Sequence, residues 1–198
     1  MKQLVLASSN PGKVREFREL LAPLGLEVVP QGELGVPDAD EPHATFVENA
    51  LAKARNASRH ARLPALADDS GICVAALAGE PGVHSARFAG EPKSDQRNNE
   101  KLVQLLADRA DRRAHYYCVV VLVRHADDPE PLITEGRWHG EVIDTPRGAG
   151  GFGWDVLFVP DGSDRTFAEM TPEEKDRVSH RRRAWDAIAG KLPLARKT

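Results

Sequence analysis

The chain has 198 residues, of which 41% are hydrophobic, 29% charged and 6% aromatic, and its formal net charge is -3. This composition is typical of one folded globular unit with a sizeable core, and it excludes a disordered chain. The small negative charge argues against a general nucleic-acid-binding surface, so any anion site must be a local cluster of cations.

The two cysteines, Cys73 and Cys118, lie in separate apolar runs without the spacing of a zinc site. Two buried thiols suit a reducing compartment. The apolar run at residues 4–7 is too short for a signal peptide, and no stretch approaches the ~18 apolar residues of a membrane span. We therefore expect a cytoplasmic protein that contacts no membrane.

The N-terminal stretch predicts a strand, a loop and a helix. Residues 3–8 are mostly apolar, and apolar residues then recur at helical spacing. Asn10 is a candidate N-cap with Pro11 at the first helical position, and Gly25 ends the helix. The free N–H groups of such a helix start, together with Lys13, would bind a phosphate. The spacing matches neither a Walker loop nor a dinucleotide fingerprint, so an ordinary strand-to-helix turn is the alternative.

A second strand is predicted at residues 26–29, followed by a polar loop at 30–44. Glu41 in this loop is a candidate ligand, although most acids in such a loop are merely solvated. The capping-box pattern that begins at Thr45 predicts a helix to about residue 61. Lys53 on this helix either faces solvent or points over the next strand.

Two adjacent carboxylates, Asp68 and Asp69, and the hydroxyl of Ser70 interrupt an apolar run over residues 64–77. We expect this polar group at a strand end or in a hairpin. Consecutive side chains of an extended chain point to opposite faces, so one carboxylate can face a pocket while the other meets a second partner. A plain turn is the alternative.

The following segment predicts a turn at residues 79–82, a loop at 83–90 and a helix from the Ser94 cap to about residue 108. The polar side chains expected on the outer face of this helix are Arg97, Asn98, Glu100 and Lys101. A central strand at 116–123 and an antiparallel neighbour at 132–138 complete the predicted scaffold.

The glycine-rich stretch at 148–155 is the second concentrated signal. Its glycines would let backbone approach a ligand, and Phe152 and Trp154 could stack on a flat ring, whereas a flexible hairpin is the alternative. A further helix is predicted from the Thr171 cap, with Val178, Trp185 and Ile188 as its apolar face, and it carries a basic run at residues 180–183.

Four separated signals, in this order and spacing, resemble the family of inosine/xanthosine triphosphate pyrophosphatases over residues 4–188. They are Ser8-Ser9-Asn10-Pro11-Gly12-Lys13, Phe46-Val47-Glu48-Asn49-Ala50 with Lys53, Ala67-Asp68-Asp69-Ser70-Gly71, and Gly151-Phe152-Gly153-Trp154-Asp155 followed by Ser179-His180-Arg181. The stretch at residues 81–87 also resembles this family.

The resemblance implies hydrolysis of non-standard purine nucleoside triphosphates (ITP, dITP, XTP) between the α- and β-phosphates, with Mg²⁺ assistance. It also implies an α/β fold with a long mixed β-sheet flanked by helices, in which residues 1–198 form a single domain of two lobes with a central cleft. Members of the family are typically homodimers, and neither nucleic acid nor membrane is an expected partner.

Residue roles follow from the same resemblance. Asp69 would be the general base and, with Glu41, a metal ligand, while Lys53 and Asp68 would support the reacting centre. The substrate would be held by Ser8, Ser9, Asn10, Pro11, Gly12, Lys13, Ser70, Phe152, Gly153, Trp154, Asp155, Lys175, His180 and Arg181. Phe152 is the expected stacking partner of the base.

An ordinary aspartate has a pKa of about 3.9 and is a poor base at neutral pH. A bound Mg²⁺ would acidify a water, and we expect the Asp68 charge to raise the pKa of Asp69. Selection for a 6-keto purine needs donors aimed at O6, and our hypothesis assigns them to His180 and Arg181.

There are two rival functions, and Asp68-Asp69-Ser70-Gly71 together with Phe152-Gly153-Trp154-Asp155 argue against the first of them. One is a pyrophosphatase for modified pyrimidine or 7-methylguanine nucleotides, as in the Maf-like group. The other is a non-catalytic nucleotide sensor, which would not need Asp69, Glu41 and Lys53 together.

Overall fold

The computed structural model describes residues 3–189 and residue 191. The strands are β1 (Gln3–Leu6), β2 (Glu27–Pro30), β3 (Ala65–Val74), β4 (Arg113–Val123), β5 (Leu132–Val142) and β6 (Phe158–Pro160). The helices are α1 (Pro11–Leu21), α2 (Phe46–Ala61), α3 (Asp95–Leu106), α4 (Pro172–Val178) and α5 (His180–Ala189). None of the helices in these described residues is both long and apolar enough to cross a membrane.

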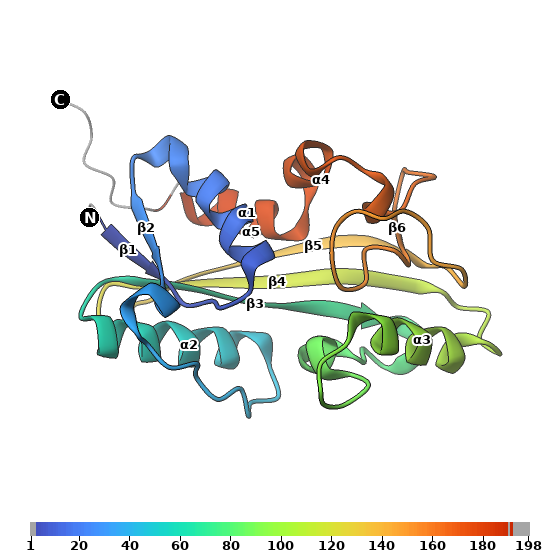
Figure 1. The fold of residues 1–198 in the computed structure, drawn as a ribbon, viewed down its shortest axis with the longest axis horizontal. Helices are drawn as coiled ribbons and strands as arrows, with labels where there is room; N and C mark the ends of the chain where they lie inside the picture. The colour runs from blue at the N-terminus through green and yellow to red at the C-terminus, as the bar shows by residue number, and fades with distance from the viewer. Residues whose placement is uncertain (1–2, 190, 192–198) are drawn as a thin grey trace. The chain divides into compact units, whose positions relative to one another are not determined.

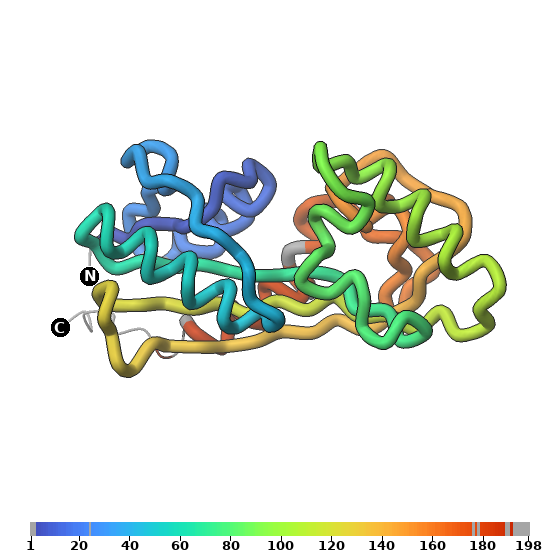
Figure 2. The backbone as a smooth tube through the Cα atoms, turned by 90° about the horizontal axis from the view of Figure 1, so that it is seen from below, coloured from blue at the N-terminus to red at the C-terminus, as the bar shows by residue number. Residues whose placement is uncertain are grey.

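The strands form one sheet in the order β2-β1-β3-β4-β5-β6. β1 pairs in parallel with β2 and β3, whereas β5 and β6 pair antiparallel, so the sheet is mixed. Helices α1 and α5 lie on the face of the sheet opposite α2 (Figure 1), and the view from below shows α2 running alongside the strands (Figure 2). The predicted α/β class, with a mixed sheet flanked by helices, is confirmed.

Helix starts lie where the local sequence predicts them. The side chains of Asn10, Thr45 and Ser94 each accept a hydrogen bond from a backbone N–H in the first turn of α1, α2 and α3. The first helix ends earlier than predicted, at Leu21, and Gly25 instead ends the 3-10 turn Ala22–Leu24 that follows it. Its backbone is left-handed, with φ of 65°, which glycine adopts without steric cost. These signals are local, and the sequence alone is therefore enough to read them.

Three predictions are wrong. The carboxylates of Asp68 and Asp69 lie inside the continuous ten-residue strand β3 rather than at a strand end, because buried cations compensate their charge. The last predicted helix is two helices, α4 and α5, since Ser179 has extended backbone with ψ of 156°. Asn98 faces inward on α3, where its amide bonds the backbone of Ser85 and Ala89 and so fixes the η4 turn (Gly82–Arg87), in the segment predicted as a loop.

The chain divides into two compact units, with boundaries inside β3, β4, β5 and α5. Unit 1 comprises Met1–Asp69, Cys118–Gly136 and Arg181–Thr198, and unit 2 comprises Ser70–Tyr117 and Arg137–His180. Each unit has a hydrophobic core of its own. Phe17, Leu66 and Trp185 are buried in the core of unit 1, and Phe158 and Phe167 in that of unit 2. The central cleft of a single two-lobed domain stays a prediction.

Candidate active site

The predicted phosphate loop joins β1 to α1 in unit 1. Oδ1 of Asn10 accepts hydrogen bonds from the backbone N–H groups of Gly12 at 2.8 Å and of Lys13 at 3.2 Å. The Ser9 hydroxyl donates to Asp38 at 2.7 Å, and Ser8 Oγ accepts from the Asn10 N–H at 3.3 Å. Two N–H groups at the start of the helix are therefore occupied by the cap itself.

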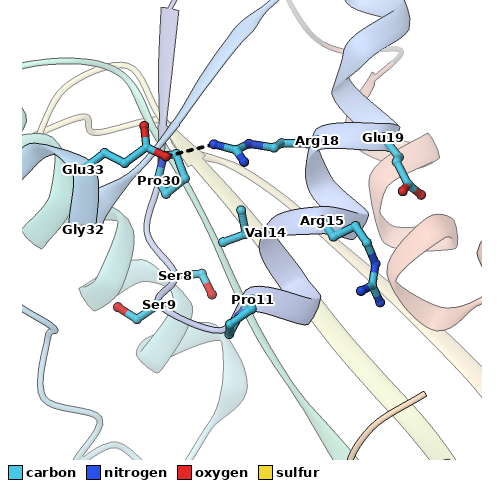
Figure 3. Close-up of a pocket in the computed structure, with 10 residues that line it drawn as sticks. All are labelled: Ser8, Ser9, Pro11, Val14, Arg15, Arg18, Glu19, Pro30, Gly32 and Glu33. Carbon is cyan, nitrogen blue, oxygen red and sulfur yellow. Dashed lines mark hydrogen bonds and ion pairs between the residues drawn. The ribbon is translucent and has the colours of Figure 1, made fainter. Parts of the chain in front are cut away.

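A pocket of about 570 Å³ lies between this loop, α1 and the segment after β2 (Figure 3). Val14 points into it, with the Ser8 and Ser9 hydroxyls at one end and the ion pair of Arg18 and Glu33 at the other. The Arg18 and Glu33 atoms are 3.0 Å apart, and both side chains are more than half exposed. The pocket beside the predicted phosphate loop is therefore apolar inside, at Val14, and charged and exposed at its edge, at Arg18 and Glu33.

Lys53 of α2 points over β3, as one of the two predicted alternatives requires. Its Nζ lies 2.9 Å from Oδ1 of Asp69 and 3.2 Å from a carboxylate oxygen of Glu41. On the same helix stripe, the amide of Asn49 donates to Oδ2 of Asp69 at 3.5 Å and to the His43 carbonyl at 3.2 Å. Each oxygen of the Asp69 carboxylate thus has a donor, Lys53 for Oδ1 and Asn49 for Oδ2, and the two donors lie one helical turn apart.

Electrostatics separate the two neighbouring carboxylates. Burial raises the pKa of Asp69 and the charge of Glu41 adds to the rise, although Lys53 and Lys13 lower it. Burial also acts to raise the pKa of Asp68, but Lys13, Arg181 and Lys53 bring it well below its usual range. The direction predicted for Asp69 is right, whereas the main cause is burial rather than the Asp68 charge.

Asp68 belongs to a buried charge network within unit 1. Its Oδ2 lies 2.9 Å from the Lys13 ammonium and 3.4 Å from Nε of Arg181, whose guanidinium also pairs with Glu16 of α1. Burial would lower the pKa of Arg181, but Glu16 and Asp68 raise it far above its usual value. Cys118 lies 3.9 Å from Asp68, where burial raises the pKa of its thiol to about 12.

A second cluster lies in unit 2 around Asp155, which is 2% exposed. Its Oδ2 accepts from the Lys175 ammonium at 2.6 Å and from the Phe152 N–H at 2.9 Å, and its Oδ1 from the Tyr116 hydroxyl at 3.1 Å. The Lys175 ammonium lies 4.7 Å from the centroid of the Phe152 ring, a cation–π distance. The glycine-rich segment is therefore tied down through Asp155 and is not a loose hairpin.

The remaining residues of the glycine-rich segment are also engaged. The Gly153 N–H donates to Asp95 at 2.7 Å, and its carbonyl accepts from Asn99 at 3.1 Å. Trp154 is 5% exposed and packs edge-on against Phe88, with ring centroids 6.1 Å apart. Trp154 is thus a core residue here, while Phe152 keeps a partly exposed ring.

Comparison with known families decides the relationship. A model of the Ham1 family matches residues 4–191, which is nearly the whole chain. The chain belongs to the Ham1 family. The resemblance read from the sequence motifs is thereby confirmed.

Named relatives of this Ham1 chain carry one activity. It is 64% identical over 197 residues to a dITP/XTP pyrophosphatase of Ralstonia nicotianae, covering 98% of both chains. It is 61% identical to a dITP/XTP pyrophosphatase of Burkholderia pseudomallei, covering 96% of this chain and 93% of that one.

Solved structures agree with the fold of this Ham1 chain. The structure of a Ham1 protein from Coxiella burnetii has a TM-score of 0.92 at 45% identity and covers 98% of this chain and 100% of its own. The structure of a nucleoside-triphosphatase/dITP/XTP pyrophosphatase from Mycobacterium abscessus has a TM-score of 0.75 at 41% identity and covers 97% and 100%. The architecture is therefore that of the Ham1 family.

The predicted site residues of this Ham1 chain fall into two groups. Those in unit 1 are Ser8, Ser9, Asn10, Pro11, Gly12, Lys13, Glu41, Lys53, Asp68, Asp69 and Arg181. Those in unit 2 are Ser70, Phe152, Gly153, Trp154, Asp155, Lys175 and His180. Contacts within each unit bring together the two lysines with the three acids, and Asp155 with Lys175 and Phe152.

Sequence reasoning missed two residues that contact predicted site residues: Glu16, which pairs with Arg181 in unit 1, and Tyr116, which bonds Asp155 in unit 2. Glu16 follows Lys13 by three residues and so shares its helix face, which is a readable signal that Glu16 lies beside the phosphate loop. Tyr116 lies in β4, whose continuous apolar run predicts only a core strand. Its hydroxyl contact with Asp155 crosses 39 residues of sequence and has no local signature.

The acids of this Ham1 site fit the Mg²⁺ that the family resemblance implies. Mg²⁺ in enzymes is usually held by one or two carboxylates together with substrate phosphates and waters. Asp69 and Glu41 both reach the same Lys53 ammonium, so their carboxylates converge. No group of three or more acid, histidine or cysteine ligands occurs among residues 3–189 and 191. A Mg²⁺ ion that is also bound by substrate phosphates and waters does not need three protein ligands.

Proposed function

We propose that this chain hydrolyses ITP, dITP and XTP to the monophosphate and pyrophosphate, which removes these nucleotides from the pool. The observation that carries the proposal is the paired arrangement of Asp68 with Lys13 and Asp69 with Lys53. Such a set of buried acids and cations suits phosphoryl chemistry, in which charge must be stabilised where it develops. The names of the Ham1 relatives from Ralstonia and Burkholderia support the substrate class.

In this proposal Asp69 is the general base for the attacking water at the α–β bond. Its raised pKa brings it closer to the operating pH than an ordinary aspartate, which favours proton transfer. Asp68, whose pKa is lowered, stays ionised and holds Lys13 in place. Lys13 and Lys53 then face the triphosphate with fixed positive charge.

Asp69 and Glu41 would hold Mg²⁺, with phosphate oxygens completing the coordination. When bound, the ion would neutralise phosphate charge and lower the pKa of a coordinated water. Burial lowers the pKa of Lys53, but Asp69, Asp68 and Glu41 together raise it, so its ammonium stays charged beside the reacting groups. Lys53 would therefore stabilise the negative charge of the phosphates or of the acids as a protonated ammonium, and would not act as a proton donor.

The purine base is assigned to the Asp155 cluster, with Phe152 as the stacking partner. Donors aimed at O6 would be left unpaired by the amino group of ATP. Such a mismatch can lower kcat/KM for ATP about 10⁴-fold relative to ITP. We keep His180 and Arg181 as the proposed donors, and rejection of GTP must work through the 2-position. Arg181 is 2% exposed and pairs with Glu16 and Asp68, so this role would require it to exchange partners.

The decisive experiment measures pyrophosphate release from ITP, XTP, ATP, GTP, modified pyrimidine triphosphates and 7-methyl-GTP, with and without Mg²⁺. We expect Mg²⁺-dependent release that favours ITP and XTP. Preference for the modified nucleotides would indicate Maf-like chemistry, and binding without release would indicate a sensor.

Asp69→Asn should lower kcat by roughly 10²–10⁴-fold, the usual cost of losing a general base. Asp127→Asn is the matched control, because the Asp127 side chain is 90% exposed and only approaches Arg59 at 3.7 Å. Near-normal turnover by Asp69→Asn, or an equal loss in both variants, would exclude the role assigned to Asp69.

We further propose a cytoplasmic homodimer that binds no nucleic acid, on the strength of the family resemblance. Light scattering of the purified chain tests the dimer, and cell fractionation tests the location. The two cysteines are free thiols, which agrees with a reducing compartment.

A further inference from the structure

Tyr116 connects two of the predicted substrate-binding residues of unit 2, Asp155 and His180. Its hydroxyl donates to Oδ1 of Asp155 at 3.1 Å. Its ring stacks on the His180 ring with centroids 4.6 Å apart and an interplanar angle of 13°. One side chain of β4 therefore contacts both residues at once.

The tyrosine hydroxyl completes the bonding of the Asp155 carboxylate. Oδ2 already accepts from Lys175 and from the Phe152 N–H, so the Tyr116 hydroxyl is the donor that Oδ1 receives. Donors on both oxygens fix the rotation of the carboxylate about its Cβ–Cγ bond. At 2% exposure, water cannot easily replace a missing donor, and an unsatisfied buried acceptor is costly.

The ring of Tyr116 is itself held from two sides. Phe158 packs against it edge-on at 4.9 Å between centroids, and Phe167 stacks at 5.5 Å. Tyr116 is 7% exposed, so its ring has little freedom to turn. A rigid ring gives His180 a fixed plane on which to lie.

We propose that Tyr116 is a positioning residue for recognition of the purine base, acting through Asp155 and His180. The proposal rests on the function proposed above and deepens it. Tyr116 orients one carboxylate and one imidazole, two groups of this cluster that can form hydrogen bonds with the edges of a base. Discrimination between a 6-keto and a 6-amino purine then depends on a hydroxyl that need not touch either nucleotide.

The test compares Tyr116→Phe with Tyr117→Phe. Tyr117 is the next residue of the same strand, and its ring lies under Arg137 at 4.7 Å rather than against Asp155, so its substitution controls for the loss of one hydroxyl. Affinity for ITP and ATP is measured calorimetrically without Mg²⁺, and steady-state hydrolysis is measured with Mg²⁺.

Tyr116→Phe should weaken ITP binding roughly tenfold, the lower range for loss of a hydrogen bond to a charged group. ATP binding should stay within about twofold, because a mismatched base gains little from the oriented carboxylate. The Michaelis constant for ITP should rise in parallel while kcat stays nearly constant, since contacts to the base are the same before and during reaction. Tyr117→Phe should match the wild type.

Tyr116→Leu extends the series by removing the ring as well. ITP preference should fall further than in Tyr116→Phe, which keeps the stack on His180. Equal losses of ITP and ATP affinity in Tyr116→Phe, or no loss at all, would overturn the positioning role. Absence of pyrophosphate release from ITP by the wild type would instead overturn the proposed function, while the binding arm would still decide the role of Tyr116.

Discussion

The buried network around Arg181 allows a sharp stability prediction. The guanidinium is 2% exposed and pairs with two carboxylates of unit 1, Glu16 and Asp68. Replacement by methionine keeps much of the apolar stem and removes the charge. Both carboxylates then lose a partner while they stay away from water.

The loss of stability in Arg181→Met depends on which partners the two carboxylates keep. Removing one partner of a buried ion pair typically costs about 3–5 kcal/mol. Asp68 keeps the Lys13 ammonium at 2.9 Å, so its charge stays partly balanced in the variant. We therefore expect Arg181→Met to lower the free energy of unfolding by about 3 kcal/mol, the lower end of that range.

Arg182→Met is the matched control. Arg182 is the next residue, its side chain is 42% exposed, and it pairs with Asp186 at 2.7 Å one turn along α5. Exposed pairs of this kind contribute about 0–1 kcal/mol. The same substitution at adjacent positions thus compares a buried guanidinium with a solvated one.

Urea titration followed by circular dichroism measures both variants. With a slope of about 2 kcal/mol per M, the midpoint for Arg181→Met should fall by about 1.5 M and that for Arg182→Met by less than about 0.5 M. Adding Glu16→Leu to Arg181→Met should recover part of the loss, because it removes a buried carboxylate whose charge the guanidinium balanced. Equal midpoints for the two single variants would refute the reasoning.

Three further predictions concern acidity, packing and thiol reactivity. As pH falls, kcat/KM for ITP should begin to drop above pH ~4, because activity needs ionised Asp69 and burial raises the pKa of Asp69. Lys53→Met should move this acid limb of the profile to higher pH, since Lys53 lowers the pKa of Asp69. A limb at or below pH ~4 in the wild type would contradict the assignment. Gly71→Ala should cost roughly 1–3 kcal/mol in urea titrations, because an added Cβ would collide with the Gly82 carbonyl oxygen and the Ser85 hydroxyl, whereas Gly32→Ala, with open space around it, should be neutral. In the native protein an aromatic disulfide reagent should label Cys73 well before Cys118, whose thiol is buried with its pKa raised to about 12; equal rapid labelling of both would be inconsistent with that burial.

Local signals made the helix starts readable from sequence. Asn10, Thr45 and Ser94 each cap a helix through a donor only two or three residues away, so a short window contains the whole interaction. The position of Lys53 over β3 was one of two alternatives, and helical spacing alone could not choose between them. The ion pair with Asp69 depends on how α2 packs on the sheet.

Distant partners explain what could not be predicted. Two carboxylates in the middle of a buried strand are improbable from pattern alone, and they are stable here because cations from other segments reach them. Arg181 meets Asp68 from 113 residues further along the chain. The break at Ser179 was hidden as well, because residues on both sides of it favour helix and the capping signal of α4 lies at its other end.

The Asn10 cap has a consequence for how a phosphate could enter the loop. Its side-chain oxygen occupies the same two N–H donors, on Gly12 and Lys13, that a phosphate at a helix start would use. If this loop binds phosphate as predicted, the anion must either displace the Asn10 side-chain oxygen from these N–H groups or be held by side-chain charge such as that of Lys13. Asn10→Gly would free both N–H donors at a cost of only a few tenths of a kcal/mol in helix stability. The Asn10 side chain alone therefore decides whether these donors are occupied or available to an anion.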